Sequence, residues 1–382
     1  MSAPLVPRSV PAEAYAAALA SLPAMGPARL AALLGHWRPM RAWQAVGADE
    51  AAGVAAIVEA LGNRARDLAA RWASAARACD VSELWQRYEQ AGVGVAALGS
   101  AAMPAPLAGD LEPPGVVFFA GDPDVITGPR VAIVGTRRCT RYGADVAREL
   151  ARDLAAVGVG VVSGLALGID GAAHAGALAA EGAPPVAVVG SGLDVVYPRQ
   201  HNLLWQRVRE AGVVLSEAPL GARPEAWRFP ARNRLIAALA DVVVVVESHE
   251  RGGSMHTVTE AERRDRPVLA VPGPVRSPAS AGTNRLIAEG AGVARDTDDV
   301  LVALGLSPGS RRRAAEHRSQ PVGTEATVLE AIGWQPASLD QLLERSAVAL
   351  GALMEALTRL EARGWVAVRG GWYERVVRET AS

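Results

Sequence analysis

The sequence contains no lysine, so all 39 of its basic residues are arginines. These are balanced by 40 acidic residues to a formal net charge of -1, which excludes a protein that binds polyanions through its overall charge. Any polyanion site must therefore be a local patch. Arginine's planar guanidinium suits phosphate groups and base faces, although a GC-rich genome is the simpler explanation of the missing lysine.

Cysteines and long apolar runs are also scarce. The two cysteines, Cys79 and Cys139, are too few for a disulfide scaffold and lack metal-ligand spacing, so we expect a cytoplasmic protein without redox chemistry or a bound metal. The purest apolar run, residues 242–246, has the length of a buried strand and not of a membrane span. Residues 1–11 contain several prolines and no cationic head before an apolar run, so we expect no secretory signal and no membrane partner.

Half of the 382 residues are hydrophobic, which suits a globular chain of two or three domains. We expect a helical domain in residues 1–75, where a Gly26-Pro27 turn opens an amphipathic helix. That turn resembles a helix-hairpin-helix or SAM-like domain, whose turn amides can contact phosphate. A plain helical turn explains the pattern equally well.

The central part of the chain alternates between apolar runs and helical stretches. Residues 76–128 predict a lead-in with a helix, proline-rich loops and one strand at 116–120. Beyond them, β-branched runs predict parallel strands that are covered on both faces. We therefore expect residues 76–306 to form an extended Rossmann-like domain, an α/β fold with a doubly wound, mostly parallel sheet. Its predicted strands are 131–135, 160–163, 186–190, 213–216, 242–247 and 268–271.

The last part of the chain predicts a linker and a winged helix. Residues 307–323 have the basic, Pro/Gly-containing composition of a solvated tether. In residues 324–382, Ser338 and Gln341 predict a capping box, and Gly370-Gly371 predicts the turn of a two-stranded wing. The helix in the position of a recognition helix carries little positive charge, so we favour a protein-interaction or regulatory role over groove reading.

The turns after the first two strands of the central domain do not suit a dinucleotide. Such a cofactor needs Gly-x-Gly-x-x-Gly and a later acidic residue, whereas this chain has Gly135-Thr136-Arg137-Arg138 and then Ser163-Gly164. We therefore expect no cofactor. Small residues, a helix N-terminus and clustered arginines favour a bound phosphate, with a surface ion pair as the alternative for Arg137.

A second cluster, residues 227–234, joins aromatic and cationic side chains just before a helix. Unpaired bases stack on aromatic rings while guanidinium groups pair with phosphate, so Phe229 and Arg232 predict contacts with single-stranded nucleic acid. We expect Arg232 to lie on the surface, where its loss would leave the fold intact. The alternative is that Phe229 packs in the core and Arg232 caps a helix.

Catalysis has no clear carrier in this sequence. Asp170 and His174 lie four residues apart on one helix face, which would suit a base and its orienter or part of a metal site. No third ligand or nucleophile is spaced with them. We therefore expect Asp170 to interact with the helix dipole and His174 to form an ordinary hydrogen bond within a packed surface.

Taken together, these turns resemble the DprA/Smf family, DNA-processing protein A, over roughly residues 116–304. The motifs are Gly135-Thr136-Arg137, Ser163-Gly164-Leu165-Ala166, Gly168-Ile169-Asp170 with His174, Gly192-Leu193-Asp194 with Tyr197-Pro198, Ser216-Glu217, Phe229-Pro230 with Arg232-Asn233-Arg234, and Val271-Pro272-Gly273. The chain departs from the family pattern at Gly252-Gly253-Ser254, where Ser-Gly-Ser is usual, and at Met103-Pro104, where Tyr-Pro is usual.

The resemblance implies a bacterial protein that binds and protects single-stranded DNA during natural transformation, loads the recombinase RecA and forms a homodimer through its Rossmann-like domain. It is not implied to be an enzyme. By motif position, Arg137, Arg232 and Asn233 would contact the DNA. The remaining residues of the expected site are Gly135, Thr136, Arg138, Ser163, Gly164, Phe229, Arg234, Gly253 and Ser254.

Two other classes of function remain open. The chain is similar to the lysine-decarboxylase-like phosphoribohydrolases in its Rossmann-like pattern, and residues 251–254 reproduce part of their Pro-Gly-Gly-x-Gly-Thr turn. A transcriptional regulator that acts through its winged helix would instead prefer one duplex sequence over single strands.

Overall fold

The computed structural model describes residues 10–62, 65–307, 319–333 and 336–376. The chain divides into two compact units, residues 1–307 and residues 308–382. Residues 308–318, which include most of the expected linker, lie outside the described residues. Within the described ranges, no helix combines the length and the apolar character that crossing a bilayer requires.

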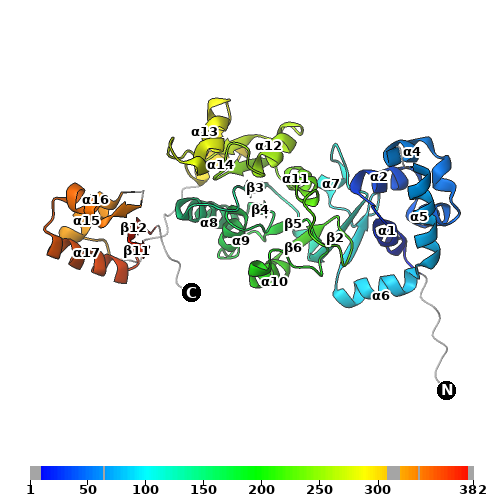
Figure 1. The fold of residues 1–382 in the computed structure, drawn as a ribbon, viewed down its shortest axis with the longest axis horizontal. Coiled ribbons are helices and arrows are strands. Elements are labelled where there is room, and N and C mark those ends of the chain that lie inside the picture. The colour runs from blue at the N-terminus through cyan, green and yellow to red at the C-terminus, as the bar shows by residue number, and fades with distance from the viewer. Residues whose placement is uncertain (1–9, 63–64, 308–318, 334–335, 377–382) are drawn as a thin grey trace, which may run out of the picture. The chain divides into compact units, whose positions relative to one another are not determined.

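A single large sheet organises the first unit (Figure 1). Its strands are β1 (Gly94–Ala97), β2 (Val116–Gly121), β3 (Arg130–Val134), β4 (Gly160–Ser163), β5 (Val186–Val189), β6 (Val213–Ser216), β7 (Val242–Val245), β8 (Val268–Ala270) and β9 (Gly292–Val293). They lie in the order β1-β2-β6-β5-β4-β3-β7-β8-β9. Every neighbouring pair from β6 to β9 is parallel, while β2 is antiparallel to both β1 and β6.

This topology confirms the predicted doubly wound, mostly parallel sheet. All the predicted strands are present, and β1 and β9, which were not predicted, extend the sheet at its two ends. The chain runs from β3 outward to β6 and then returns to β7 on the other side of β3. The strand order therefore reverses between β3 and β7, and ligands of open α/β sheets bind near such a reversal, at the carboxyl ends of the strands.

Helices cover both faces of the parallel strands, as the β-branched runs require. The helices on one face are α8 (Arg141–Ala156), α9 (Ile169–Ala177), α10 (Asn202–Ala211) and α14 (Thr297–Ala303). Those on the other face are α7 (Ala105–Ala108), α11 (Arg228–Leu239), α12 (Ser254–Glu262) and α13 (Ala281–Ala288). Successive side chains of β3 point to opposite faces of the sheet, since Ile133 packs with α8 and α9 while Val134 packs with α11.

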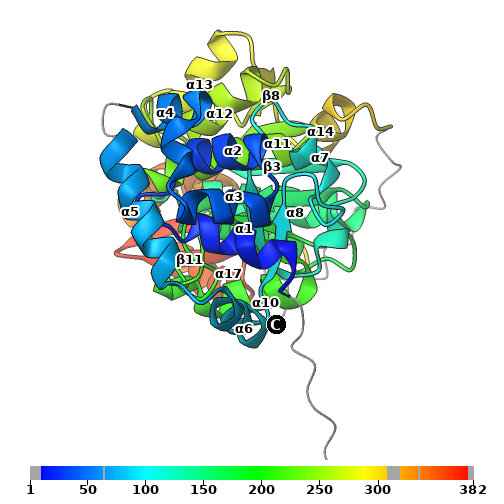
Figure 2. The same cartoon turned by 90° about the vertical axis from the view of Figure 1, so that its right-hand side faces the viewer.

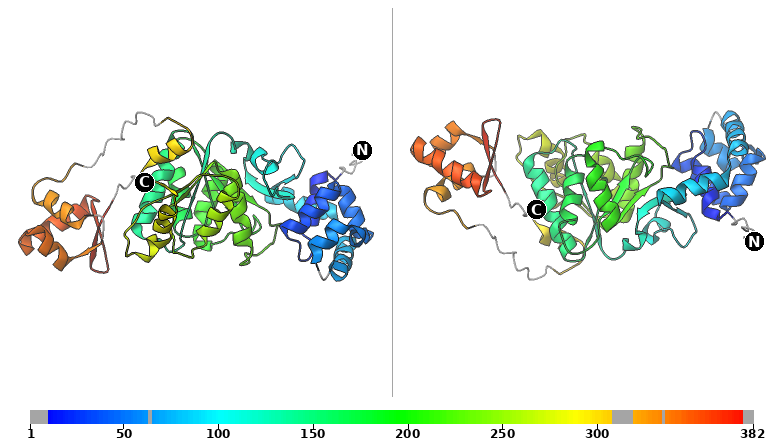
Figure 3. Two further views of the ribbon diagram at one scale, coloured as in Figure 1. Left: turned by 90° about the horizontal axis from the view of Figure 1, so that it is seen from above. Right: turned by 90° about the horizontal axis from the view of Figure 1, so that it is seen from below.

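The N-terminal helices lie together at the end of the sheet that β1 and β2 form (Figures 1 and 2). They are α1 (Ala12–Ala20), α2 (Pro27–His36), α3 (Pro39–Gly47), α4 (Ala55–Leu61), α5 (Ala65–Ala78) and α6 (Val81–Ala91). Figure 3 shows the same grouping from two further sides. The expected boundary after residue 75 falls inside α5, and one apolar core joins Leu33 and Trp72 of these helices to Phe118 of β2.

The second unit has the winged-helix arrangement that the sequence predicts. Its elements are α15 (Thr324–Ile332), β10 (Ala337–Ser338), α16 (Leu339–Ser346), α17 (Leu350–Ala362), β11 (Val366–Arg369) and β12 (Trp372–Arg375). Ser338 and Gln341 form the predicted capping box, and Gly370 and Gly371 take positive φ angles of 57° and 83° in the hairpin turn. The two-stranded wing, β11 and β12, is present, and the two-residue β10, which was not predicted, pairs with β12 as a third strand of the sheet.

Short 3-10 helices complete the described structure. They are η1 (Glu50–Gly53), η3 (Pro123–Val125), η4 (Arg199–His201) and η5 (Pro278–Ser280). Of these, η4 directly follows the Tyr197-Pro198 segment, which borders the candidate site described below.

Candidate nucleic-acid interface

Turns at the carboxyl ends of β3, β4 and β5 enclose a pocket together with the first turn of α11, which we call the rim pocket. Its lining residues are Arg137, Gly164, Ala166, Leu167, Val189, Gly190, Ser191, Tyr197, Pro198, Phe229 and Arg232. Two sequence segments that lie almost 100 residues apart therefore meet here, as the nucleic-acid interpretation requires. Because these strands are parallel and are joined by helices, the turns at their carboxyl ends lie at the same edge of the sheet.

An exposed cation and two aromatic rings stand at the mouth of the rim pocket. The guanidinium carbon Cζ of Arg137 lies 4.7 Å from the centroid of the Phe229 ring. Tyr197 is 42% exposed, and its ring centroid lies 5.6 Å from that of Phe229. Among the described residues no carboxylate forms an ion pair with Arg137, so the surface ion pair considered as its alternative is not present.

The loop that carries Arg137 is hydrogen-bonded to Glu247, which follows β7. The Glu247 carboxylate, which is 3% exposed, accepts hydrogen bonds from the Thr140 amide at 2.8 Å and from the Thr140 hydroxyl at 2.5 Å. The Thr136 amide donates to the Glu247 carbonyl oxygen at 2.7 Å. A Cβ on Gly135 would lie 2.7 Å from that same oxygen, so the turn needs glycine there. Arg137 and the exposed Arg138 thus project from a fixed loop.

Arg232 is not the surface residue that the sequence predicted. It is 8% exposed, and its guanidinium donates to the carbonyl oxygens of Gly164 and, at 2.7 Å, of Val188. It also pairs with the buried Asp170 carboxylate at 3.6 Å. Burial raises the pKa of Asp170, and the Arg232 charge opposes that rise. The expectation that Arg232 could be removed without disturbing the core is therefore wrong.

The position of the Arg232 guanidinium explains why residue 164 is a glycine. A Cβ built on it would lie 2.2 Å from Nη2 of Arg232, so any other residue would displace the guanidinium. Ser163, its neighbour, is fully buried, and its hydroxyl donates to the Ile133 carbonyl oxygen at 2.7 Å. Its side chain therefore supports β3 and does not face the pocket.

The structure does not bring the next two candidates on α11 into the rim pocket. Asn233 is buried and donates through Nδ2 to the Gly253 carbonyl oxygen at 3.3 Å. Arg234 is also buried, forms an ion pair with Glu217 and donates to the Glu112 carbonyl oxygen at 2.8 Å. Burial raises the pKa of Glu217 to about 7, while Arg234 opposes that rise.

The turn before α12 is likewise used internally. The Ser254 hydroxyl is buried and donates to the hydroxyl of Ser248 at 2.8 Å, while Gly253 stays exposed at the start of the helix. The buried Glu247, which precedes this turn, is bound to Thr140, as described above.

His174 differs from its expectation. It is fully buried beside β4, where the Ser163 backbone is the hydrogen-bonding group next to its ring. Burial lowers its pKa to about 3, so it is neutral at physiological pH. No group of three or more His, Cys, Asp or Glu side chains among the described residues is placed to hold a metal ion.

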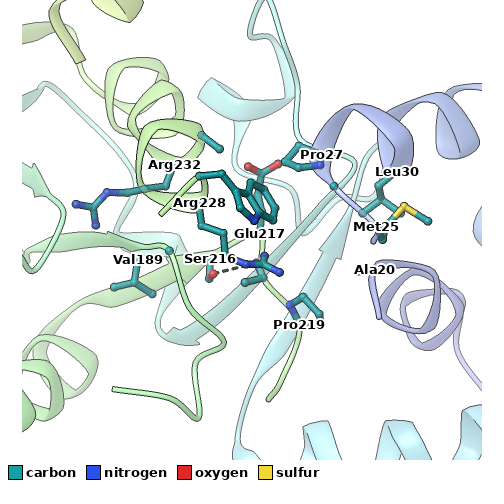
Figure 4. Close-up of a pocket in the computed structure, with 15 residues that line it drawn as sticks. Ala20, Met25, Pro27, Leu30, Val189, Ser216, Glu217, Pro219, Arg228 and Arg232 are labelled. Carbon is teal, nitrogen blue, oxygen red and sulfur yellow. Dashed lines mark hydrogen bonds between the residues drawn. The ribbon is translucent and has the colours of Figure 1, made fainter. Parts of the chain in front are cut away.

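A second pocket, which we call the helix-side pocket, was missed by the sequence reasoning. Its lining residues are Ala20, Met25, Gly26, Pro27, Leu30, Val189, Gly190, Ser216, Glu217, Ala218, Pro219, Trp227, Arg228, Ala231 and Arg232. Figure 4 shows Met25 and Leu30 of the helical part opposite Ser216 and Arg228. The Gly26-Pro27 turn was a visible signal, but the sequence could not show which strand ends it faces.

Comparisons with known proteins agree with this architecture. A family model described as DNA recombination-mediator protein A matches residues 95–305, and one described as the DprA winged helix domain matches residues 312–371. The chain is 40% identical over 262 residues to a putative DNA processing protein DprA of Mycobacterium tuberculosis, covering 68% of this chain and 67% of that protein. It is 35% identical to DNA processing protein DprA of Bacillus subtilis, over 57% of this chain and 73% of the relative.

A solved structure supports the same assignment. The X-ray structure of DNA processing protein A from Streptococcus pneumoniae resembles this chain with a TM-score of 0.64 at 30% identity, over 76% of this chain and 96% of that one. The first family model alone spans more than half of the 382 residues. The chain therefore belongs to the DprA/Smf family of DNA-processing proteins.

Proposed function

We propose that this protein binds single-stranded DNA in the rim pocket and delivers it to the RecA recombinase during natural transformation. The observation that carries the proposal is the exposed Arg137 guanidinium, 4.7 Å from the Phe229 ring and without a carboxylate partner among the described residues. A cation of this kind can bind a phosphate while the rings beside it stack on a base.

The form of the pocket favours an unpaired strand over a duplex. Its aromatic rings, Phe229 and the half-exposed Tyr197, can stack only on bases whose faces are accessible, and a duplex hides those faces. Arg138 adds a second exposed cation on the same loop. The family model's description as a recombination mediator supports DNA as the ligand and recombination as the process.

Further parts of the proposal rest on the family resemblance. We infer a homodimer formed through the first unit, a cytoplasmic location and a role without catalysis. The last point is supported by the buried acidic groups nearest the strand ends, because Asp170 is paired with Arg232 and Glu247 is bound to Thr140.

The test is a comparison of single-stranded and duplex oligonucleotides with the full chain at several salt concentrations. We expect tighter binding of the single strand, and we expect Arg137→Ala to weaken that binding about tenfold because a charge-assisted contact is lost. The slope of log affinity against log salt should also fall by about 0.7, the value for one phosphate contact on a single strand. Added RecA should assemble on the bound strand faster than on free DNA.

The matched control is Arg207→Ala, which removes an exposed arginine of α10 that lines neither pocket. It should leave affinity and salt slope unchanged. Equal affinity for both forms of DNA, or an Arg137→Ala protein that binds like the wild type, would refute the proposed site. Release of free base from a nucleoside monophosphate would instead favour a hydrolase.

A further inference from the structure

The N-terminus of α11 separates the rim pocket from the helix-side pocket. Phe229 lines the first, whereas Trp227 and Arg228 line the second. Residues two apart in a helical turn point about 200° apart around the axis, which explains why the two aromatic rings face different pockets. Val189, Gly190 and Arg232 line both, so the two pockets adjoin each other across the end of β5.

The helix-side pocket repeats the aromatic and cationic pairing of the rim pocket. The guanidinium carbon of Arg228 lies 4.5 Å from the centroid of Trp227, which is 46% exposed. Pro27, at the start of α2, and the Met25 side chain form the facing wall (Figure 4). The space inside the pocket is about 30 Å³, which is too small for a base, so a planar ring would stack on the exposed indole at the opening of the pocket.

The charges in the helix-side pocket differ from those in the rim pocket. Arg228 is paired with Glu225 at 3.2 Å, and Arg232 is paired with Asp170 at 3.6 Å. The pocket also contains Glu217, whose Oε1 accepts from Arg234. Because its cations are already paired and a carboxylate lines it, the pocket does not suit a phosphate. A base that presents an amino group to Glu217 suits it better, since carboxylates accept hydrogen bonds from such groups.

We propose that the helix-side pocket is a second base-binding site, which holds another base of the strand whose phosphate binds Arg137. This inference rests on the function proposed above. The bound strand would cross the end of β5 at Gly190, with one base stacked at Phe229 and another at Trp227. The turn between α1 and α2 would then form part of the DNA-binding surface.

The experiment measures binding of a single-stranded oligonucleotide to the full chain at pH 8 as a function of salt. Trp227→Ala should weaken binding roughly 5- to 150-fold, the factor for one lost base stack. The salt slope should stay that of the wild type because no phosphate contact is lost. Trp227→Phe should retain most of the affinity, since it keeps an aromatic face. Ala231→Leu, which narrows the pocket while Trp227 itself is retained, should weaken binding in the same way.

Trp372→Ala is the matched control, because Trp372 is also 46% exposed but lies in the second unit. Normal binding by Trp227→Ala and Ala231→Leu, together with weakened binding by Arg137→Ala, would overturn the second base site alone. A salt slope that falls in Trp227→Ala as it does in Arg137→Ala would also overturn it, since the pocket would then hold a phosphate. Failure of the proposed function differs from both, because Arg137→Ala would then bind normally.

Discussion

Arg232→Ala should strongly destabilise the first unit, although its position in the sequence marks it as a ligand contact. The substitution removes one partner of a buried ion pair, leaves Asp170 uncompensated and deprives the carbonyl oxygens of Gly164 and Val188 of their donor. Removing one partner of a buried pair costs about 3–5 kcal/mol. That is a large part of the roughly 5–15 kcal/mol by which a domain is stable.

The assay is urea unfolding of the full chain, with Arg137→Ala as the control. Because Arg137 is exposed and has no ion pair among the described residues, its loss should change the unfolding free energy by no more than about 0.5 kcal/mol. Adding Asp170→Asn to Arg232→Ala should recover part of the loss, because the uncompensated charge is then gone. A non-additive interaction of roughly 0.5–3 kcal/mol is expected for such neighbours.

The pH dependence gives the same prediction a second readout. Burial raises the pKa of Asp170 in the folded state, and removal of Arg232 takes away the charge that opposes this rise. An acid with a raised folded pKa stabilises the fold below its ordinary value of 3.8 and loses that contribution as pH increases through the folded pKa. The deficit of Arg232→Ala should therefore be larger at pH 8 than at pH 4. Equal urea midpoints for Arg232→Ala and the wild type at pH 8 would refute the reasoning.

Two further predictions concern the buried His174 side chain and the cap of α16. Burial lowers the pKa of His174 from 6.5 to about 3, so the folded state resists protonation and stability should fall as pH decreases from 6.5 toward 3. His174→Leu should reduce the difference between urea midpoints at pH 7 and pH 5, and an unchanged difference would contradict this explanation. Ser338→Ala removes the acceptor of the Gln341 amide and should cost α16 about 1 kcal/mol. Amide hydrogen exchange in the full chain should then be faster in α16 and unchanged in α8; equal exchange in α16 would argue against the cap.

The sequence predicted those features that depend on local pattern. Runs such as residues 242–246 predicted parallel strands because strands buried on both faces are apolar at every position, and Val242 to Val245 are all buried in β7. The capping box at Ser338 was predictable for a similar reason, since both of its hydrogen bonds join residues three apart. The position of Arg137 at the end of a strand placed it at the ligand edge of the sheet.

Tertiary structure alone decided which arginines are free. Arg137 and Arg232 have the same chemistry, but Arg232 lies on the face of α11 that meets the sheet, where Asp170, Gly164 and Val188 surround it. Those partners are 44 to 68 residues away in the sequence, and no local pattern specifies that they converge. The helix-side pocket has the same origin, because the turn at Gly26 meets the start of α11 only when the chain folds. Local sequence sets the period of each element, whereas the burial of a charge depends on long-range packing.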